Sequence, residues 1–327
     1  MAIQGVAAPG FIRRIGEIVD RRRGVEFQEL KSRSLVNRLA GRGMPFGWTV
    51  NPFRGCELGC RYCYARPTHE YLGHTQPEEF EDRIYVKRSD LWSLMTDLKR
   101  ARDSGQEVAI GAATDPYQPA EARFRITRGI LEAIAMVPGL RVGITTKSPA
   151  VTRDLEILQA ISRRAELHVN VSVISLDADL LRLIEPRAPR PDLRLRAVRR
   201  LSEAGVPTRV FLMPVLPLIT DGDANLRAVL GAARAAGARE VICNALFLRT
   251  PMVWTFFLRF IQEEFPWALA RYRQLYPGPG SAPREYRETI EQRVEAIARK
   301  AGFPARSREE RVKDEGPSRS RQLSLVW

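Results

Sequence analysis

Three cysteines with the spacing C-x3-C-x2-C are the residues of this sequence best suited to chemistry. Cys56, Cys60 and Cys63 lie within eight residues of one another, whereas Cys243 lies far along the chain. Four cysteines are too few to form the disulfide scaffold of a 327-residue protein. Three cysteines this close together are poorly suited to disulfide bonds and well suited to binding metal.

Two kinds of metal site fit this pattern. Three thiolates on one tight loop, aided by Gly55 and Gly59, can ligate three irons of a [4Fe–4S] cluster. The fourth iron can then bind the amino and carboxylate groups of S-adenosylmethionine (SAM), whose reductive cleavage would release a 5′-deoxyadenosyl radical. The alternative is a Cys3His zinc site that recruits His69 or His74. Zinc sites usually contain two C-x2-C pairs, and only one is present here.

Six short apolar runs alternate with amphipathic segments from about residue 48 onward. Short runs rich in Val, Ile and Leu are typical of buried parallel strands. The runs are Thr49–Phe53, Val108–Ala112, Arg141–Thr145, His168–Ile174, Arg209–Val215 and Val241–Phe247. Six such units in series predict an α/β fold, either an open sheet or a partial barrel. In these folds the site lies at the carboxyl ends of the strands, and the cysteines directly follow the first run.

Helical patterns fill the segments between the runs and continue after the last one. The expected helices are Ser89–Ser104, Thr127–Val137, Thr152–Arg164, Pro191–Ala204, Asp223–Ala236, Val253–Glu264 and Pro283–Lys300. Thr152 is a candidate N-cap for the third of these helices. Gly205 and Gly237 are stop signals for the fourth and fifth.

The segment NPFRGCELGCRYCYA, residues 51–65, resembles the signature of the radical SAM superfamily. It is similar in particular to the subgroup that includes spore photoproduct lyase. The resemblance implies a partial (β/α)6 barrel over residues 48–250, with a [4Fe–4S] cluster on the three cysteines. It also places Tyr62 next to the adenine of SAM.

The resemblance assigns further SAM contacts to polar residues at other strand ends. Thr114 and Asp115 would meet the amino group, Lys147 the carboxylate and Ser172 the ribose. The alternatives are turn chemistry, a solvated loop lysine and a small buried serine. Arg187, in the segment EPRAP, could bind a carboxylate bidentately or be one more charge on a solvated face.

One position departs from the lyase pattern. Ala112 stands where the lyase has a cysteine that returns a hydrogen atom to the product radical. Thymine-dimer reversal by the same route is therefore not expected. Cys243 could donate hydrogen from the sixth strand, although a buried cysteine usually packs as a small hydrophobe.

The chain divides by composition into four expected regions. Residues 1–47 form a basic arm, 48–250 the radical SAM core, 251–304 a helical extension and 305–327 a charged, flexible tail. No apolar run approaches the roughly 20 residues of a membrane-spanning helix. The N-terminus also lacks the order of a secretory signal, so a cytoplasmic protein with no membrane association is expected.

The charge of the chain favours a polyanionic partner. The net charge is +14, and the arginines of Arg21–Arg23 and Arg194–Arg200 could contact phosphates of DNA or RNA. The expected function is a radical SAM enzyme that repairs or modifies nucleic acid, with an electron donor such as flavodoxin or ferredoxin. The alternatives are a radical SAM enzyme acting on a protein or small molecule, and a non-catalytic, zinc-stabilised nucleic-acid-binding protein.

The C-terminal tip QLSLVW resembles the peptide that bacterial repair proteins insert into the cleft of the sliding clamp. Gln322, Leu323 and Leu325 would carry this contact. The alternative is that the tip folds back and covers an apolar patch of its own domain.

Overall fold

The structure, a computed structural model, describes residues 15–22, 24–39 and 44–304. The clamp-binding residues predicted at the C-terminus, Gln322, Leu323 and Leu325, lie outside the described residues.

The larger sheet has seven strands in the order β11-β10-β9-β8-β7-β4-β3. Neighbouring strands from β4 to β11 run parallel, and β3 pairs antiparallel with β4 at one edge. The strands are β3 (Val36–Arg38), β4 (Trp48–Val50), β7 (Val108–Ile110), β8 (Arg141–Thr146), β9 (Glu166–Ser172), β10 (Thr208–Val215) and β11 (Glu240–Ala245). The predicted series of six parallel strands is confirmed, with one additional edge strand.

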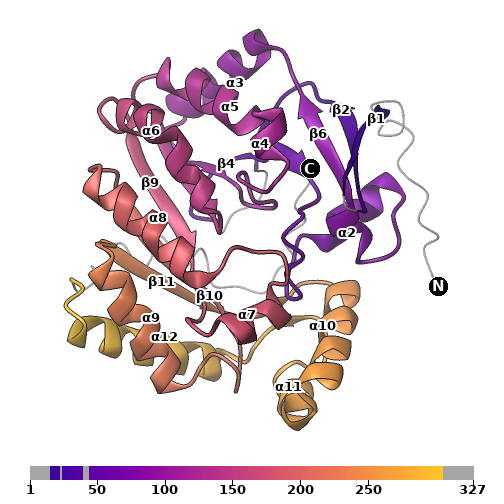
Figure 1. Cartoon of the computed structure of the whole chain (residues 1–327), viewed down its shortest axis with the longest axis vertical. Coiled ribbons are helices and arrows are strands. Elements are labelled where there is room, and N and C mark those ends of the chain that lie inside the picture. Colours follow the sequence, from indigo (N-terminus) through magenta and orange to yellow (C-terminus); the bar gives the residue numbers. More distant parts are fainter. Residues whose placement is uncertain (1–14, 23, 40–43, 305–327) are drawn as a thin grey trace.

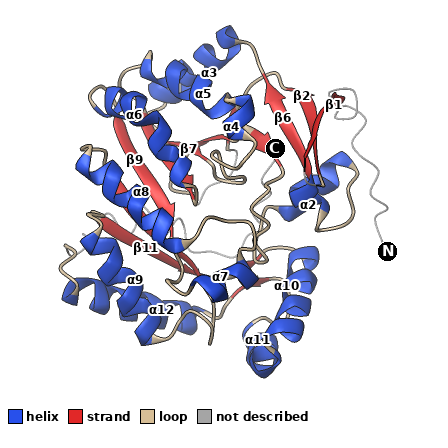
Figure 2. Ribbon diagram, viewed as in Figure 1, coloured by secondary structure: helices blue, strands red, loops and turns tan. Residues whose placement is uncertain are grey.

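Six helices pack on one face of this sheet and bury its Val, Ile and Leu side chains in the main core (Figure 1 and Figure 2). They are α3 (Leu91–Asp103), α5 (Ile126–Ala135), α6 (Leu155–Ser162), α8 (Pro191–Glu203), α9 (Asp223–Ala235) and α12 (Arg284–Lys300). Because side chains alternate along a strand, the other face carries the residues in between. That inner face is largely polar, and the site lies at its carboxyl edge.

The start of α6 differs from the prediction. Thr152 does not cap a helix, because its hydroxyl donates to the Pro149 carbonyl within the 3-10 turn η2 (Pro149–Asp154). Ser148 caps that turn, and α6 begins only at Leu155.

A smaller sheet of four strands, in the order β1-β2-β6-β5, lies beside the first (Figure 1). Its strands are β1 (Ile15–Arg22), β2 (Val25–Lys31), β5 (Phe53–Arg54) and β6 (Arg83–Arg88). Three of the strands that the sequence analysis did not predict, β1, β2 and β3, lie in the expected basic arm. Val25 and Phe27 of that arm are buried with Phe53 and Ile84 in a core of their own.

The predicted strand Thr49–Phe53 is wrong as a single element. The chain leaves the larger sheet after Val50 and enters the smaller sheet at Phe53. Between them, Pro52 has no N–H for a strand ladder, and Asn51 accepts from the Ala113 N–H at 2.9 Å. The last predicted run is divided in the same way, because Ala245 ends β11 and β12 (Phe247–Leu248) pairs with β13 (Gly280–Ser281).

The remaining helices surround the carboxyl edge of the larger sheet or extend the C-terminal part of the chain. They are η1 (Arg66–Leu72), α2 (Glu79–Asp82), α4 (Glu121–Phe124), α7 (Ala178–Ile184), α10 (Pro251–Glu264), η3 (Pro266–Ala268) and α11 (Leu269–Leu275). Among the described residues, no helix has both the length and the hydropathy needed to cross a membrane.

Candidate active site

The cysteine loop, residues 56–63, begins directly after β5 and lies beside the carboxyl ends of the parallel strands. Backbone hydrogen bonds hold it from two sides. The Cys56 N–H donates to the Phe80 carbonyl at 2.8 Å, and the Arg61 N–H donates to the Ile184 carbonyl at 2.9 Å. The loop is therefore positioned by α2 on one side and by the end of α7 on the other.

The loop meets the requirements for holding a cluster. All three of its cysteines are free, with Cys56 and Cys60 buried and Cys63 half-buried. Gly55 and Gly59 have φ angles of 87° and 66°, in the left-handed region that favours glycine. A Cβ at Gly55 would lie 2.6 Å from a backbone oxygen, and one at Gly59 would lie 2.2 Å from a carboxylate oxygen. Only glycine fits at these two bends of the loop.

The electrostatics of the thiols also favour a metal group. Burial raises the pKa of Cys60 to about 12 and the pKa of Cys56 well above its usual range. Thiolates buried this closely together need a cation to stabilise them, and bound metal ions supply that charge. Among the described residues, no three His, Cys, Asp or Glu side chains converge on a single ion. Ligands of a cubane cluster bind separate irons, so the two observations are compatible.

Lys147, Tyr62, Glu185 and Arg194 form a buried polar group beside Cys60. The Tyr62 hydroxyl donates to one oxygen of Glu185, and the Lys147 ammonium lies 4.0 Å from the same oxygen. Arg194 lies 2.5 Å from the other oxygen. The ammonium also lies 5.7 Å from the centre of the Tyr62 ring. The structure therefore brings together two of the predicted SAM contacts, Lys147 and Tyr62.

The charges of this group are balanced in the buried state. Burial alone would lower the pKa of Lys147, but Cys60 and Glu185 outweigh it and raise that pKa. Burial alone would raise the pKa of Glu185, but Arg194 and Lys147 outweigh it and lower that pKa. Lys147 is therefore a cation at the end of β8, and the Glu185 carboxylate is the anion that holds it there.

Asp115, in the turn after β7, connects the end of that strand to the end of β8. One of its oxygens accepts from the Thr146 hydroxyl at 2.7 Å, and the other accepts from the Lys147 N–H at 2.7 Å. The backbone of Asp115 also lies near Cys56 and opposes the rise of its pKa. The Thr114 hydroxyl donates to the Phe53 carbonyl at 3.2 Å. Both residues lie beside the cysteine loop, and their side chains hold the turns around it.

Ser172 and Arg187 are the remaining predicted SAM contacts. One lies against the buried polar group beside Cys60, and the other lies away from it. Ser172 is buried at the end of β9, and its carbonyl accepts from Arg194 at 3.1 Å. Arg187 is 44% exposed and pairs with Asp82 at 3.0 Å, on the outer side of the loop. The structure thus places Arg194, rather than Arg187, against the buried carboxylate.

The two histidines of the zinc alternative lie in a separate aromatic group around Tyr85. His69 Nε2 lies 2.7 Å from the Arg83 carbonyl. The two ring nitrogens of His74 contact Glu79 and the Tyr85 hydroxyl at 2.8 and 2.6 Å. No contact in the described residues brings either ring to the cysteines.

Sequence reasoning did not assign Glu185 or Tyr64 to the site. Glu185 is buried. In the sequence it is the acidic residue directly before the proline of the segment EPRAP, and this was the available signal. Tyr64 follows the last cysteine, and its hydroxyl donates to the Ala112 carbonyl. Ala112, the position that departs from the lyase pattern, therefore lies beside the cysteine loop.

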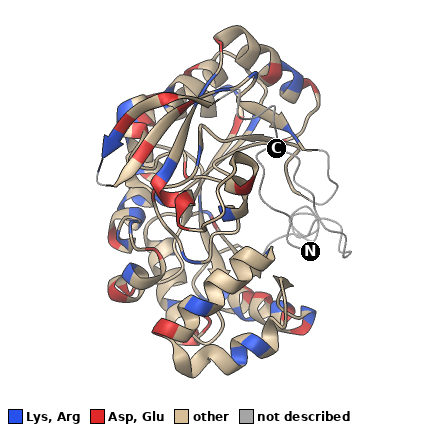
Figure 3. Ribbon diagram, turned by 90° about the vertical axis from the view of Figure 1, so that its right-hand side faces the viewer, with Lys and Arg blue, Asp and Glu red and all other residues tan. Residues whose placement is uncertain are grey.

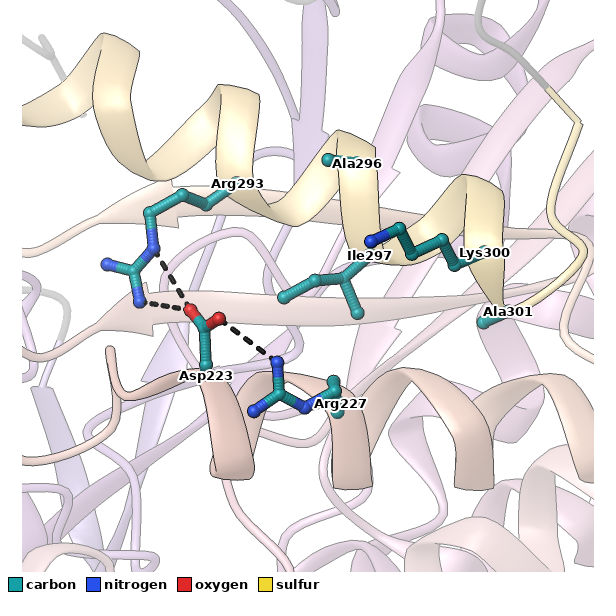
Figure 4. A pocket seen from close by; sticks show the side chains of 7 residues that line it. All are labelled: Asp223, Arg227, Arg293, Ala296, Ile297, Lys300 and Ala301. Atoms are coloured by element: carbon teal, nitrogen blue, oxygen red, sulfur yellow. Dashed lines mark hydrogen bonds and ion pairs between the residues drawn. The ribbon is translucent and has the colours of Figure 1, made fainter.

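Away from the cysteine loop, a pocket of about 410 Å³ lies between α9 and α12 (Figure 4). Arg227 and Arg293 point into it, and both are hydrogen bonded to Asp223, at 3.0 and 2.5 Å. The Arg293–Asp223 pair joins α12 to α9 and the Arg227–Asp223 pair lies within α9, so we assign no ligand to this pocket.

Comparisons with known proteins agree with this geometry. Residues 50–228 match the family model described as the radical SAM superfamily. An uncharacterized protein of Mycobacterium tuberculosis is 35% identical over 306 residues, which cover 92% of this chain and 89% of the relative. An uncharacterized protein of Methanocaldococcus jannaschii is 26% identical over 197 residues, which cover 60% of this chain and 70% of the relative.

Solved structures of spore photoproduct lyase share the fold. A mutant of that enzyme superimposes with a TM-score of 0.62 at 15% identity, covering 82% of this chain and 79% of the lyase. Another mutant, with bound AdoMet and dinucleoside spore photoproduct, gives a TM-score of 0.61 at 16% identity, covering 79% and 74%. At these identities the likeness is one of fold, and it confirms the predicted architecture.

Proposed function

Because the chain belongs to the radical SAM superfamily and is therefore an enzyme, we propose that Cys56, Cys60 and Cys63 bind a [4Fe–4S] cluster together with SAM. The observation that carries this proposal is the buried loop of three free cysteines next to the Lys147 cation. When bound, the reduced cluster supplies the electron that cleaves SAM to methionine and a 5′-deoxyadenosyl radical. The non-catalytic zinc alternative is not compatible with membership of this family.

The side chains around the loop have distinct tasks in this proposal. Lys147 binds the SAM carboxylate as a cation, and Glu185 keeps that cation buried and oriented. Tyr62 supports the adenine with a ring whose hydroxyl is fixed by Glu185. Asp115 holds the backbone of Lys147 and has lone pairs left for the SAM amino group. Ser172 remains our proposal for the ribose contact.

The proposal is tested by metal content and by SAM cleavage. Protein purified without oxygen should be brown and contain about four irons and four sulfides per chain. With dithionite and SAM it should release 5′-deoxyadenosine. A colourless protein that contains one zinc ion would contradict the proposal.

We further propose that the substrate is a nucleic acid. The net charge of +14 and the exposed arginines Arg196, Arg199 and Arg200 on α8 support a polyanion. Arg194 is not available for phosphate contacts, because its side chain is buried against Glu185. Figure 3 shows that basic and acidic residues are mixed on the face drawn there, so charge alone does not mark one binding surface.

Binding to DNA and RNA at several salt concentrations tests the substrate class. If phosphates are contacted, affinity should fall as salt rises, because each contact releases counterions. Replacing Arg196, Arg199 and Arg200 with Gln should reduce the salt slope. Binding that does not respond to salt would favour the alternative of a protein or small-molecule substrate. Reduction by flavodoxin or ferredoxin in place of dithionite tests the proposed electron donor.

A further inference from the structure

Three buried polar atoms on or directly after strands of the larger sheet have no hydrogen-bond partner among the described residues. They are Thr49 Oγ1, Asn51 Nδ2 and Asn170 Oδ1. The exposed fractions of these residues are 1%, 2% and 4%. An unpartnered polar group buried to this extent destabilises the folded protein, so its presence calls for a cause.

These atoms belong to the inner face of the sheet. Trp48 and Val50, on either side of Thr49, pack in the main core under the helices. The neighbours of Asn170, Val169 and Val171, do the same. Because side chains alternate along a strand, Thr49 and Asn170 point to the opposite face, away from the helices. Asn51 directly follows β4, and its side chain reaches the Ala113 N–H in the turn after β7.

Asn51 and Asn170 stand on either side of a floor of small residues. Asn170 pairs with Thr145 on the adjacent strand. Gly111, which follows β7, approaches Thr145 so closely that a Cβ would lie 2.4 Å from the Thr145 carbonyl oxygen. Asn51 directly follows β4 and Asn170 lies on β9, and these are the first and last strands of the series β4-β7-β8-β9. At a strand spacing of about 4.8 Å, β4 and β9 are about 14 Å apart across the sheet.

The two amides present opposite hydrogen-bonding groups. Asn51 uses its oxygen for the Ala113 N–H, which leaves its NH2 as a donor. Asn170 uses its NH2 for the Thr145 hydroxyl at 3.3 Å, which leaves its oxygen as an acceptor. A ligand between them needs an acceptor at one edge and an N–H at the other.

The residues between and beside the two asparagines favour a flat ligand. Gly111 and Thr145 are partly exposed and add little bulk. Phe211, on β10 next to Ser172, is also partly exposed and offers a ring for stacking. A heterocyclic base has a flat ring with C=O and N–H groups on separate edges. We propose that Asn51, Asn170 and Thr49 bind a nucleobase of the substrate beneath the SAM site. This inference rests on the proposed function and specifies which part of the nucleic acid enters the barrel.

The first test uses the reconstituted enzyme with four deoxydinucleotides, d(ApA), d(CpC), d(GpG) and d(TpT), and an abasic dinucleotide as the control. At least one base-containing probe should bind about tenfold more tightly than the abasic probe. Asn170→Leu removes the acceptor, and Asn51→Asp keeps the oxygen used by Ala113 while replacing the donor. Each change should weaken that probe about tenfold and leave binding of the abasic probe unchanged.

The second test separates recognition from a structural role. Thr49→Val removes the unpartnered hydroxyl and should raise the melting temperature of the free protein by about 2 °C. Thr208→Val is the matched control, because Thr208 is equally buried in the same sheet but donates to the Val206 carbonyl at 2.9 Å. That control should lower the melting temperature and leave probe binding unchanged.

Two results would overturn this inference. One is equal binding of all five probes by the wild-type enzyme. The other is a fall in melting temperature for Thr49→Val as large as that for Thr208→Val, which would mean that ordered water or the fold itself satisfies the hydroxyl. If the wild-type enzyme still releases 5′-deoxyadenosine, either result counts against the base site alone. Absence of that release would instead count against the proposed function.

Discussion

Arg194 and Glu185 form an ion pair in which the two side chains are 1% and 0% exposed, with 2.5 Å between Nη2 and Oε2. Arg194 also donates to the carbonyls of Pro189 and Ser172, at 2.7 and 3.1 Å. Glu185 in turn accepts from Tyr62 and faces Lys147. One ion pair thus connects α8, the end of β9 and the cysteine loop.

We predict that Glu185→Gln destabilises the protein by about 3–5 kcal/mol, because it leaves Arg194 buried without its anion. The same change should weaken SAM binding through the loss of the partner of Lys147. Denaturant unfolding and SAM titration measure the two effects. Glu166→Gln removes an exposed pair with Arg141 and should cost less than about 1 kcal/mol. Similar losses for both variants would contradict a special role for Glu185.

Cys60→Ala should abolish iron binding and release of 5′-deoxyadenosine together, because it removes one of three ligands. Cys243→Ala is the matched control, since Cys243 lies on β11 outside the loop. Iron and sulfide analysis of the two variants, purified without oxygen, provides the comparison. Full iron content in Cys60→Ala would remove this residue from the ligand set.

Lys147→Ala should weaken SAM binding about tenfold or more, because a charge-assisted hydrogen bond to the SAM carboxylate is lost. Its iron content should remain that of the wild type, since Lys147 is not a ligand. Asp115→Ala should act in the same direction by releasing the Lys147 backbone. Equilibrium binding of SAM to the reconstituted variants measures the effect. Normal affinity in both variants would show that the assignments at these two strand ends are wrong.

We predict that Lys87, on β6, makes the free energy of unfolding depend on pH. Burial, with help from nearby Arg54, lowers the pKa of Lys87 from 10.5 to about 7. Between pH 7 and about 10 the unfolded chain therefore binds more protons at this residue than the folded protein, so stability should rise with pH across that window. Lys87→Met should raise the melting temperature at pH 7 and reduce this rise. Lys99→Met, at an exposed position on α3, should change neither. An unchanged pH profile in Lys87→Met would refute the prediction.

The clamp-binding tip remains a proposal, and a peptide tests it. A fluorescent peptide of residues 316–327 should bind a bacterial sliding clamp at micromolar strength, through Leu323 and Leu325. Changing both leucines to Ala should abolish binding. If the free peptide does not bind, and deleting the tip lowers the melting temperature of the protein, the tip instead folds onto its own domain.

The parts of the site that could be predicted from the sequence are those encoded locally. The cysteine spacing and the polar residues directly after apolar runs led to Cys60 and Lys147 without knowledge of the fold. Glu185 could not be found in this way, because it contacts Tyr62 across 123 positions of the chain. The same holds for Asn51 and Asn170, whose unpartnered atoms become apparent only once β4 and β9 are placed in one sheet.

The strands that escaped prediction did so for physical reasons. The sequence of β2, VEFQELK, alternates between apolar and polar residues as a strand should. Its charged residues resemble those of the surrounding basic segment, so the alternation was not recognised as a strand. β5 has only two residues, too few for a recognisable period. The division of Thr49–Phe53 depended on where the partner strands lie, since β4 pairs with β7 and β5 pairs with β6.

The parallel pairing of β2 with β6 has a consequence for the order in which the cysteine loop is enclosed. Both strands belong to the smaller sheet, and the cysteine loop lies between them in the chain. During synthesis the cysteines therefore leave the ribosome before β6, so the wall formed by the Phe80 carbonyl is not yet in place. Until that wall forms, the Cys56 N–H lacks the partner that holds the loop in the folded protein. Under the proposed function, a cluster would therefore enter most readily before this part of the fold buries Cys56.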